Sequence, residues 1–413
     1  MSKLQPVRGT HDLLPEESRR FAHVVDTSRA VAALYGYREM ATPIFEFTEL
    51  FARGIGETSD VVSKEMYTFE DRGGDSLTLR PEYTAGICRA FISNGELAQQ
   101  LPLKIFAAGP MFRYERPQKG RQRQFHQIDI EVLGAPEPGA DIEVITLAAD
   151  ILDRLGILDR CVLKLNSLGD PQSRAGYRQV LVDYYRGHID KLSDDSRARL
   201  ERNPLRILDS KDEGDKAINA EAPSLAEYLN QSSREFFAAV REGLGAAGIS
   251  FELDPALVRG LDYYTHTAFE FVTSHIGAQG TVLGGGRYDG LIAELGGPPT
   301  AGIGWAGGIE RLMMLCNEPP APARPVVLVP LGAAAEAKAL GLGRALRAAG
   351  IAVEQDYRGT MKRRMQRANK LNARAAVILG DDELAQGVVQ LKDLDSGEQH
   401  GVAMNGLVEA LKT

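Results

Sequence analysis

A cluster of positive charge lies near position 120, between two stretches of apolar and aromatic residues. Residues 109–115 have the character of one strand, and residues 124–131 that of a second. Residues 113–123, which include the loop between them, carry five cations against the single acid Glu115: Arg113, Arg116, Lys119, Arg121 and Arg123. Guanidinium groups pair well with phosphate oxygens, and an aromatic such as Phe125 can stack on a base. The sequence therefore predicts a hairpin that holds a polyphosphate and a nucleobase.

The returning strand of this hairpin carries further polar groups. Side chains alternate along a strand with a period of two, so one face is formed by every second residue: Phe125, Gln127, Asp129 and Glu131. An amide and two carboxylates therefore lie in a row beside the cationic loop. A hairpin on the surface would not need them there. Asp129 shares the face, and we assign it no role.

Two other segments combine residue types that suit a binding pocket. Residues 257–267 contain Arg259, a permanent cation, followed closely by the phenols of Tyr263 and Tyr264. Residues 284–290 begin with three glycines, which allow a ligand to lie against bare backbone. Taken alone, the first segment is better explained by a surface ion pair and core tyrosines, and the second by an ordinary loop.

A glycine-spaced strand passes into a helix at residues 301–312, and the first turn of that helix carries Glu310 and Arg311. A guanidinium stacks favourably on a purine ring. Arg311 and Phe125 could therefore cover opposite faces of an adenine.

The elements that must position these residues divide the chain into parts of different character. Strand signals recur up to about residue 166 and again from about residue 250, whereas residues 171–247 show helical periodicity and dense charge. Residues 317–325 contain four prolines and form the clearest boundary. Strands and helices then alternate, which predicts a small α/β domain. We place a main domain at 1–318 with a helical insertion at 171–247, a linker at 319–325 and the α/β domain at 326–413.

Residues 358–374 of the last domain carry seven cations and no acid: Arg358, Lys362, Arg363, Arg364, Arg367, Lys370 and Arg374. Such a helix is about as often a solvated face as a binding surface. The formal net charge of the whole chain is −8, so this local concentration favours contact with a phosphate backbone. The same net charge argues against indiscriminate binding of nucleic acid.

The composition is that of a globular protein with two or three domains: 413 residues, 44% hydrophobic and 25% charged. Its three cysteines are isolated in sequence, which indicates buried thiols rather than disulfides or a zinc site. No secretion signal and no membrane-spanning run are visible, so we expect a cytoplasmic protein without membrane contact. A Walker loop and a dinucleotide fingerprint are also missing from the sequence.

Together these segments resemble the motifs of the histidyl-tRNA synthetases, a family of class II aminoacyl-tRNA synthetases. The hairpin resembles class II motif 2, and residues 301–312 resemble motif 3. Residues 257–267 and 284–290 resemble two signatures of the histidine enzymes, and residues 78–85 resemble the loop that binds the substrate amine. The last domain resembles the anticodon-binding module of class IIa enzymes. The resemblance covers the whole chain and implies an α+β fold, in which helices flank an antiparallel catalytic sheet with a helical insertion and an α/β anticodon-binding domain.

The resemblance implies a histidine–tRNA ligase. ATP and L-histidine would form histidyl-adenylate, and histidine would pass to the 3′ end of tRNA(His). Mg²⁺ is expected with ATP, and no metal ligand is assigned among the protein side chains. A homodimer is also expected, as for other class II enzymes. Catalysis would consist of positioning and electrostatic stabilisation of the reacting phosphate.

The roles implied by the resemblance fall into four sets. The catalytic residues are Arg113 and Arg259, one on each side of the α-phosphate. The residues expected to bind histidine are Glu82, Tyr83, Thr84, Arg113, Gln127, Glu131, Arg259, Tyr263 and Tyr264. Those expected to bind ATP are Arg113, Glu115, Arg121, Phe125 and Arg311. Those expected to bind tRNA are Gln118, Arg123, Arg363 and Arg367.

Some of these roles carry more detail. Glu131 would accept a hydrogen bond from the imidazole N–H, and Tyr264 would donate one to its bare nitrogen. Arg121 could serve either the outer phosphates or the tRNA end. Most relatives have a glycine where this chain has Tyr83.

Two rival interpretations remain. One is the synthetase-like regulatory subunit of histidine biosynthesis, which senses histidine without aminoacylation. Such subunits lack the last domain and lose the sequence found here at residues 259–262. The other is a class IIa enzyme for proline or threonine, which would not need Glu131 beside paired tyrosines.

Overall fold

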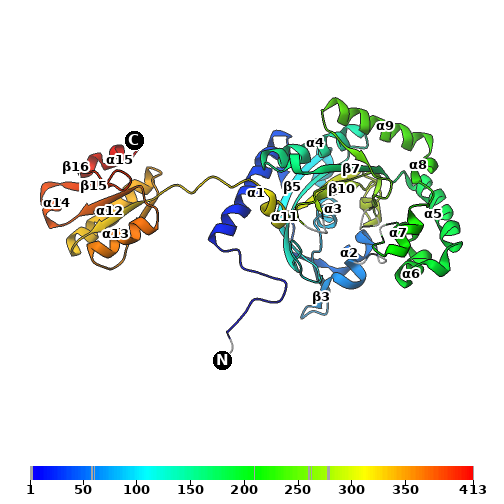
Figure 1. The fold of residues 1–413 in the computed structure, drawn as a ribbon, viewed down its shortest axis with the longest axis horizontal. Helices are drawn as coiled ribbons and strands as arrows, with labels where there is room; N and C mark the ends of the chain where they lie inside the picture. The colour runs from blue at the N-terminus through cyan, green and yellow to red at the C-terminus, as the bar shows by residue number, and fades with distance from the viewer. Residues whose placement is uncertain are drawn as a thin grey trace. The chain divides into compact units, whose positions relative to one another are not determined.

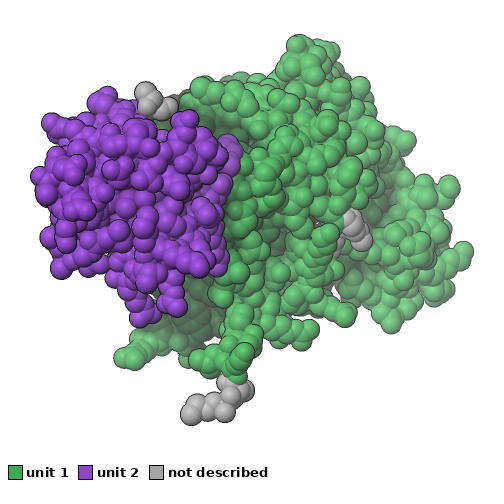
Figure 2. Space-filling model, turned by 60° about the vertical axis from the view of Figure 1, so that its left-hand side comes forward, with its two compact units in different colours: residues 1–319 green, residues 320–413 purple. Residues whose placement is uncertain are grey.

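A computed structural model of the chain describes residues 3–56, 59, 61–208, 210–258, 261, 263–276 and 280–412. It contains two compact units, Met1–Pro319 and Pro320–Thr413. Figure 1 shows their elements and Figure 2 colours the two units separately. Each unit has its own sheet and its own hydrophobic core.

The first unit is built on a large sheet, with eight strands among the described residues in the order β1-β5-β6-β11-β10-β9-β7-β8. Its six inner strands pair antiparallel: β5 (Leu103–Phe112), β6 (Gln124–Leu133), β11 (Gly302–Gly308), β10 (Thr281–Arg287), β9 (Thr265–Val272) and β7 (Val162–Ser167). Two short strands extend its edges in parallel, β1 (Arg38–Glu39) and β8 (Glu252–Leu253). This is the antiparallel sheet that the sequence predicts.

The two faces of β6 have different environments because its side chains alternate. Ile128, Ile130 and Val132 point into a core formed with α1 (Pro15–Leu34), α4 (Pro138–Arg154), α9 (Gln231–Ala246) and α11 (Ile309–Leu315). The opposite face carries the polar residues identified in the sequence. A second core on that side includes α3 (Thr84–Ser93) and α10 (Leu291–Glu294).

Smaller elements complete the first unit. A three-stranded sheet of β2 (Phe45–Phe47), β4 (Ser76–Leu79) and β3 (Tyr67–Glu70) adjoins α2 (Thr48–Ile55). Between β7 and β8 the described chain is helical: α5 (Pro171–Arg186), α6 (Asp194–Arg202), α7 (Glu213–Asn219), α8 (Leu225–Tyr228) and α9 (Gln231–Ala246). Polar N-caps begin several of these helices. Asp170, for example, accepts from the Ser173 amide at the start of α5.

The second unit has a mixed sheet in the order β13-β12-β14-β15-β16. β12 (Val326–Pro330) is parallel to β13 (Val353–Gln355) and β14 (Ala375–Leu379), whereas β15 (Val388–Asp393) and β16 (Gln399–Ala403) continue it antiparallel. Its helices are α12 (Ala333–Ala348), α13 (Met361–Lys370), α14 (Asp381–Gln386) and α15 (Leu407–Ala410). In the described part of the chain, no helix combines the length and apolar character needed to cross a membrane.

Candidate active site

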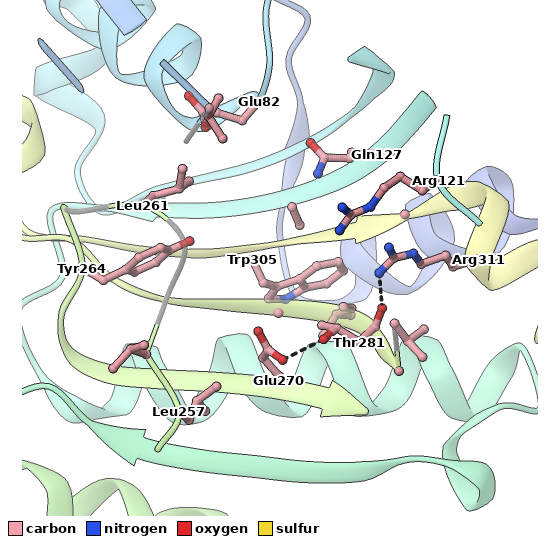
Figure 3. Close-up of a pocket in the computed structure, with 18 of the residues that line it drawn as sticks. Glu82, Arg121, Gln127, Leu257, Leu261, Tyr264, Glu270, Thr281, Trp305 and Arg311 are labelled. Atoms are coloured by element: carbon pink, nitrogen blue, oxygen red, sulfur yellow. Dashed lines mark hydrogen bonds between the residues drawn. The ribbon is translucent and has the colours of Figure 1, made fainter. Parts of the chain in front are cut away.

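A cavity of about 750 Å³ lies in the first unit, over the polar face of β6 and the neighbouring strands β10 and β11. Figure 3 shows Arg121 and Arg311 together at one side of it and Tyr264 at the other, with Gln127 and Trp305 between them. Ten residues with expected roles line it: Glu82, Thr84, Arg113, Glu115, Arg121, Phe125, Gln127, Tyr263, Tyr264 and Arg311. Asp129, to which no role was assigned, lines it as well. The structure therefore joins segments that are far apart in the sequence.

Three guanidinium groups form what we call the arginine end of the cavity: Arg113, Arg121 and Arg311. Each is already bonded to the protein. Arg113 Nε donates to the Pro81 carbonyl at 2.9 Å, and its guanidinium lies 5.3 Å from the centre of the Phe125 ring. Arg121 pairs with Glu115 at 2.6 Å. Cations this close repel one another, so an anion placed among them is favoured.

Arg311 connects the arginine end to two other parts of the site. Its Nε donates to the Gly120 carbonyl at 3.1 Å and its terminal nitrogen to the Thr281 carbonyl at 2.6 Å, as Figure 3 shows for the second bond. Burial and then the neighbouring charge of Arg121 lower the pKa of Arg311. Its backbone neighbour Glu310 accepts from the His126 amide and contacts the His126 ring, which fixes the start of α11 against β6.

The other end, which we call the carboxylate end, is formed by Glu82, Gln127, Asp129, Glu131 and Tyr264. Glu82 Oε1 accepts from the Ala85 amide at 2.9 Å. Glu82 Oε2, Gln127 Oε1 and both Asp129 oxygens have no hydrogen-bond partner among the described residues. Buried acceptors without partners are rare in folded proteins and are satisfied when a ligand donates to them. The carboxylate end is therefore shaped for a ligand with several N–H donors.

Glu131 lies one layer below the cavity surface and is 1% exposed. It accepts from the Thr84 hydroxyl at 2.5 Å and from the Tyr288 hydroxyl, and both of those residues line the cavity. Burial raises the pKa of Glu131 to about 8. A Cβ atom at Gly304 of β11 would overlap the Glu131 carboxylate, so only glycine leaves room for this arrangement.

Tyr264 reaches the cavity wall in a similar way. Its ring packs against β10 at Gly286, where an added Cβ would come within 2.9 Å of the ring. Its backbone carbonyl accepts from Arg174 of α5 at 2.6 Å. The ring of Tyr263 lies 4.6 Å from that of Tyr264, centre to centre. The helical segment and β10 therefore both contribute to the position of Tyr264.

Besides Glu131, three expected site residues of the first unit do not line the cavity: Tyr83, Gln118 and Arg123. The side chain of Tyr83 is buried and packs its ring on the Arg80 guanidinium at 4.0 Å, so its contact with histidine stays a prediction. Arg123 lies over the Tyr114 ring at 3.8 Å and donates to the Glu115 carbonyl. Gln118 is exposed at the tip of the hairpin. Arg259 falls outside the described residues.

The basic helix α13 does not present one continuous cationic face. Arg363 is exposed, whereas Arg364 is buried and donates to Glu336 and to the Gly359 carbonyl. Arg367, expected to bind tRNA, already pairs with Asp356 at 2.8 Å. This pairing makes Arg367 a weaker candidate for contact with a tRNA phosphate, because its charge is partly balanced within the protein.

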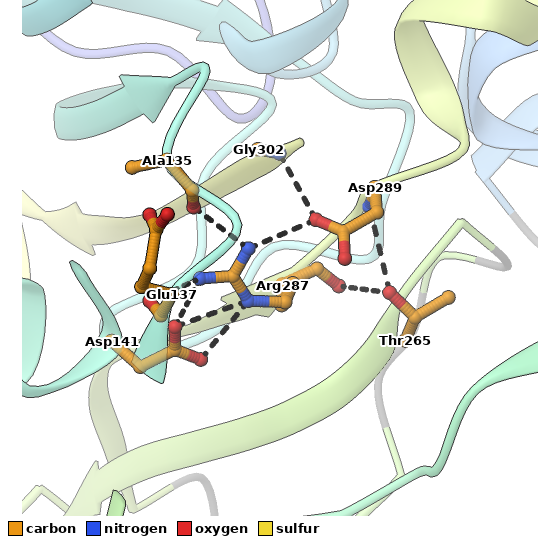
Figure 4. Close-up of polar contacts among 7 residues, drawn as sticks. All are labelled: Ala135, Glu137, Asp141, Thr265, Arg287, Asp289 and Gly302. Atoms are coloured by element: carbon orange, nitrogen blue, oxygen red, sulfur yellow. Dashed lines mark hydrogen bonds and ion pairs between the residues drawn. The ribbon is translucent and has the colours of Figure 1, made fainter. Parts of the chain in front are cut away.

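Sequence reasoning missed a buried network around Arg287, shown in Figure 4. Arg287 is fully buried and donates to Asp141 of α4, to Asp289 and to the carbonyls of Ala135 and Glu137. Asp289 also accepts from the amide of Gly302. The network ties β10 and β11 to the start of α4, and removal of one partner would leave an uncompensated buried charge. Its only signal in the sequence was an arginine after the glycine run.

Glu270 was also missed, because it is a single acid within an apolar strand. It lines the arginine end and accepts from the Thr281 hydroxyl at 2.8 Å, as Figure 3 shows. Among the described residues, no group of three or more His, Cys, Asp or Glu could hold a metal ion by itself. Glu115 and Glu270 still place two carboxylates beside the arginines. That donor set fits Mg²⁺, which is commonly held by one or two carboxylates together with substrate phosphates.

An antiparallel sheet with a cavity of this kind, joined to a separate α/β unit, defines a class II aminoacyl-tRNA synthetase. The chain belongs to the histidyl-tRNA synthetase family. The model of that family, described as Histidyl-tRNA synthetase, matches residues 9–312, and a model described as Anticodon binding domain matches residues 325–413.

Known proteins show the same similarity over the full length. A protein named Histidine--tRNA ligase from Rhodospirillum rubrum is 60% identical and covers 100% of this chain and 99% of its own. One of the same name from Gluconacetobacter diazotrophicus is 59% identical with the same coverage. The crystal structure of apo histidyl-tRNA synthetase from S. aureus has a TM-score of 0.83 at 35% identity and covers 100% of both chains.

Proposed function

We propose that this protein is a histidine–tRNA ligase that activates L-histidine with ATP and transfers it to tRNA(His). The observation that carries the proposal is the cavity itself: three guanidinium groups at one end face unpaired, buried acceptors at the other. The first end suits a nucleoside triphosphate and the second suits an amino acid with its ammonium group. Gln127 lies between them, where the carboxylate of the amino acid would meet the α-phosphate.

The proposed first step is an in-line attack of the histidine carboxylate on the α-phosphorus, which releases pyrophosphate. Negative charge grows on the equatorial oxygens during this step. Arg113 would stabilise that charge from the side of β5, with Arg259 as its expected counterpart. A bound carboxylate is ionised at neutral pH, so no general base is needed. Catalysis then depends on positioning and electrostatics.

Adenine would lie between Phe125 and Arg311, with the outer phosphates beside Arg121. Glu115 and Glu270 are the residues that would hold Mg²⁺ there. When bound, the ion would balance the charge of the outer phosphates. Glu115 pairs with Arg121, so the outer phosphates of ATP would share Arg121 with Glu115.

Histidine would be selected by Glu131 and Tyr264. Neutral imidazole has one N–H donor and one acceptor nitrogen, which a carboxylate and a phenol can satisfy together. An amino acid lacking either feature would leave a buried polar group unpaired, which can reduce its use by roughly 10⁴-fold. Glu131 accepts from the hydroxyl groups of Thr84 and Tyr288, so an imidazole N–H would share its oxygens with them or replace one of them.

We further propose that the second unit contacts tRNA through Arg363, and that the protein acts in the cytoplasm as a homodimer. Full-length similarity to ligases supports the assignment over a regulatory subunit of histidine biosynthesis. The presence of an anticodon-binding match at residues 325–413 supports it too.

The test is amino-acid-dependent exchange of pyrophosphate into ATP, run with all twenty amino acids, followed by aminoacylation of tRNA(His). Exchange with L-histidine alone, together with charging of the tRNA, is the expected result. Binding of histidine without exchange would support the regulatory subunit instead. Exchange driven by proline or threonine would identify a different class IIa enzyme.

A further inference from the structure

Asp129 is a buried acid in the wall of the cavity, and the proposed mechanism assigns it no role. It is 1% exposed and lies on β6 between Gln127 and Glu131. Both of its carboxylate oxygens lack a hydrogen-bond partner among the described residues. Its strand neighbours offer nothing polar, because it faces Ala107 on β5 and Ala306 on β11. A buried, unpartnered carboxylate that lines a cavity indicates a ligand group that donates to it.

The acceptors around Asp129 define the kind of group that fits. Glu82 Oε2 and Gln127 Oε1 are likewise without partners in the described structure, and both residues line the same cavity. Thr84, the other polar residue of the amine-binding loop, donates its hydroxyl proton to Glu131. Three side chains with free acceptors therefore remain. A primary ammonium group carries three N–H donors, one for each of them.

The charges of the neighbouring residues also indicate an ammonium group. Three acids, Glu82, Asp129 and Glu131, are buried close together. Burial, followed by the negative charges of Glu131 and Glu82, raises the pKa of Asp129 well above its usual range. Arg80 and Arg113 oppose this shift, but both donate to backbone carbonyls of the protein. A cationic ligand group would stabilise the ionised form of these acids, whereas a neutral donor would do so much less.

We propose that Asp129 accepts a hydrogen bond from the α-ammonium group of L-histidine, together with Glu82 and Gln127, and so selects substrates that carry a free, charged amine. This inference rests on the proposed function, since it concerns the same substrate in the same cavity. Burial raises the pKa of Asp129, and a cation beside it favours its ionised form, so histidine binding is expected to release a proton. Glu131, two residues further along β6, would accept a hydrogen bond from the imidazole N–H in the same way.

Binding can be followed by the fluorescence of Trp305, which lines the cavity and is the only tryptophan in the sequence. Three ligands distinguish binding of the ammonium group from binding of the imidazole ring. They are L-histidine, L-histidinol, which keeps the ammonium group but lacks the carboxylate, and imidazolepropionate, which lacks the ammonium group. Imidazolepropionate is measured by its competition with histidinol. The full-length wild-type protein is compared with the Asp129→Asn and Glu131→Gln variants, which make the same chemical change at neighbouring positions of one strand face.

The Asp129→Asn variant should bind L-histidine and histidinol about 10- to 100-fold more weakly, while imidazolepropionate stays within about twofold of wild type. The Glu131→Gln variant should weaken all three ligands to a similar extent. Calorimetry in buffers with different ionisation enthalpies should show less proton release on histidine binding for Asp129→Asn than for wild type. A role limited to folding would not produce this pattern across ligands.

Two results would overturn the inference. Equal weakening of all three ligands by Asp129→Asn would assign Asp129 to the imidazole ring or to the fold. Unchanged affinity for histidinol would show that Asp129 does not meet the ammonium group. In both cases wild-type binding and exchange with L-histidine would leave the proposed function standing. If the wild-type protein neither binds L-histidine nor catalyses exchange with it, the proposed function fails as well.

Discussion

The two ends of the cavity differ in whether their polar groups are already bonded to other groups of the protein. At the arginine end, Arg113, Arg121 and Arg311 are each bonded to the protein, to carbonyls or to Glu115. At the carboxylate end, Glu82, Gln127 and Asp129 have acceptors with no partner among the described residues. A nucleotide therefore meets guanidinium groups that the protein already holds in place, whereas an amino acid meets buried acceptors that lack a partner in the described structure.

We expect this difference to separate the residues that control the rate of adenylate formation from those that control the selectivity for histidine. Guanidinium groups held in place at the arginine end can stabilise the charge that develops on the phosphate, which affects the transition state. Fixed, unsatisfied groups at the carboxylate end reject ligands that cannot donate to them. Variants at the first end should chiefly lower the rate of adenylate formation, and variants at the second should chiefly change the KM for histidine.

The largest effect is expected for Arg113→Ala. Loss of this guanidinium should lower kcat for pyrophosphate exchange by about 10²- to 10³-fold, because it acts on charge that appears in the transition state. Arg116→Ala is the matched control: Arg116 is exposed on the same loop and does not line the cavity. Near-normal kcat for Arg113→Ala, or equal losses in both variants, would show that the arginine end does not control the rate.

The second prediction concerns the carboxylate end and uses two glycines of β11. Gly304→Ala would push a Cβ into the Glu131 carboxylate, whereas a Cβ at Gly307 would meet Leu283 at an ordinary 3.4 Å. Gly304→Ala should raise the KM for histidine by about 10- to 100-fold, since small displacements of positioning groups are costly. Gly307→Ala should stay close to wild type. Both KM values come from exchange assays, and a similar KM for ATP in both variants would confirm that the fold persists.

The same comparison shows what the sequence alone could predict. The hairpin was expected from strand character at residues 109–115 and 124–131, and its strands are β5 (Leu103–Phe112) and β6 (Gln124–Leu133), so the first strand ends before Arg113. Alternation along β6 also placed Gln127 and Asp129 on the cavity face. Such features depend on local periodicity, which is present in the sequence itself.

Other features depend on tertiary contacts and could not be predicted. Arg363 and Arg364 are neighbours with the same charge, yet only Arg364 is buried, because Glu336 and the Gly359 carbonyl accept from it. Tyr83 turns inward because Arg80 offers its flat guanidinium face. Glu131 lies below the cavity surface because two hydroxyl groups and a glycine surround it.

A third prediction tests the cost of burying acid at the carboxylate end. The pKa of Glu131 is raised from 4.5 to about 8, so the folded protein holds a proton that the unfolded chain loses. The unfolding free energy should therefore fall as pH rises from about 4.5 to about 8. Glu131→Gln removes this contribution, so its melting temperature relative to wild type should increase from pH 5 to pH 9. Glu213→Gln, at an exposed position on α7, is the surface control. A constant difference across this pH range would contradict the raised pKa.

The smallest effect is expected in the second unit, where the contrast between bonded and unbonded groups recurs on the surface of α13. Arg363 is exposed, whereas Arg367 pairs with Asp356 at 2.8 Å. Arg363→Ala should weaken tRNA(His) binding by about threefold to tenfold and reduce the slope of log K against log salt by about one, because one phosphate contact is lost. Arg367→Ala should change both quantities less, since Asp356 already balances its charge. Filter binding at several salt concentrations measures both. A larger loss for Arg367→Ala would mean that tRNA displaces Asp356, and that paired arginines serve RNA here as they serve ATP at the arginine end.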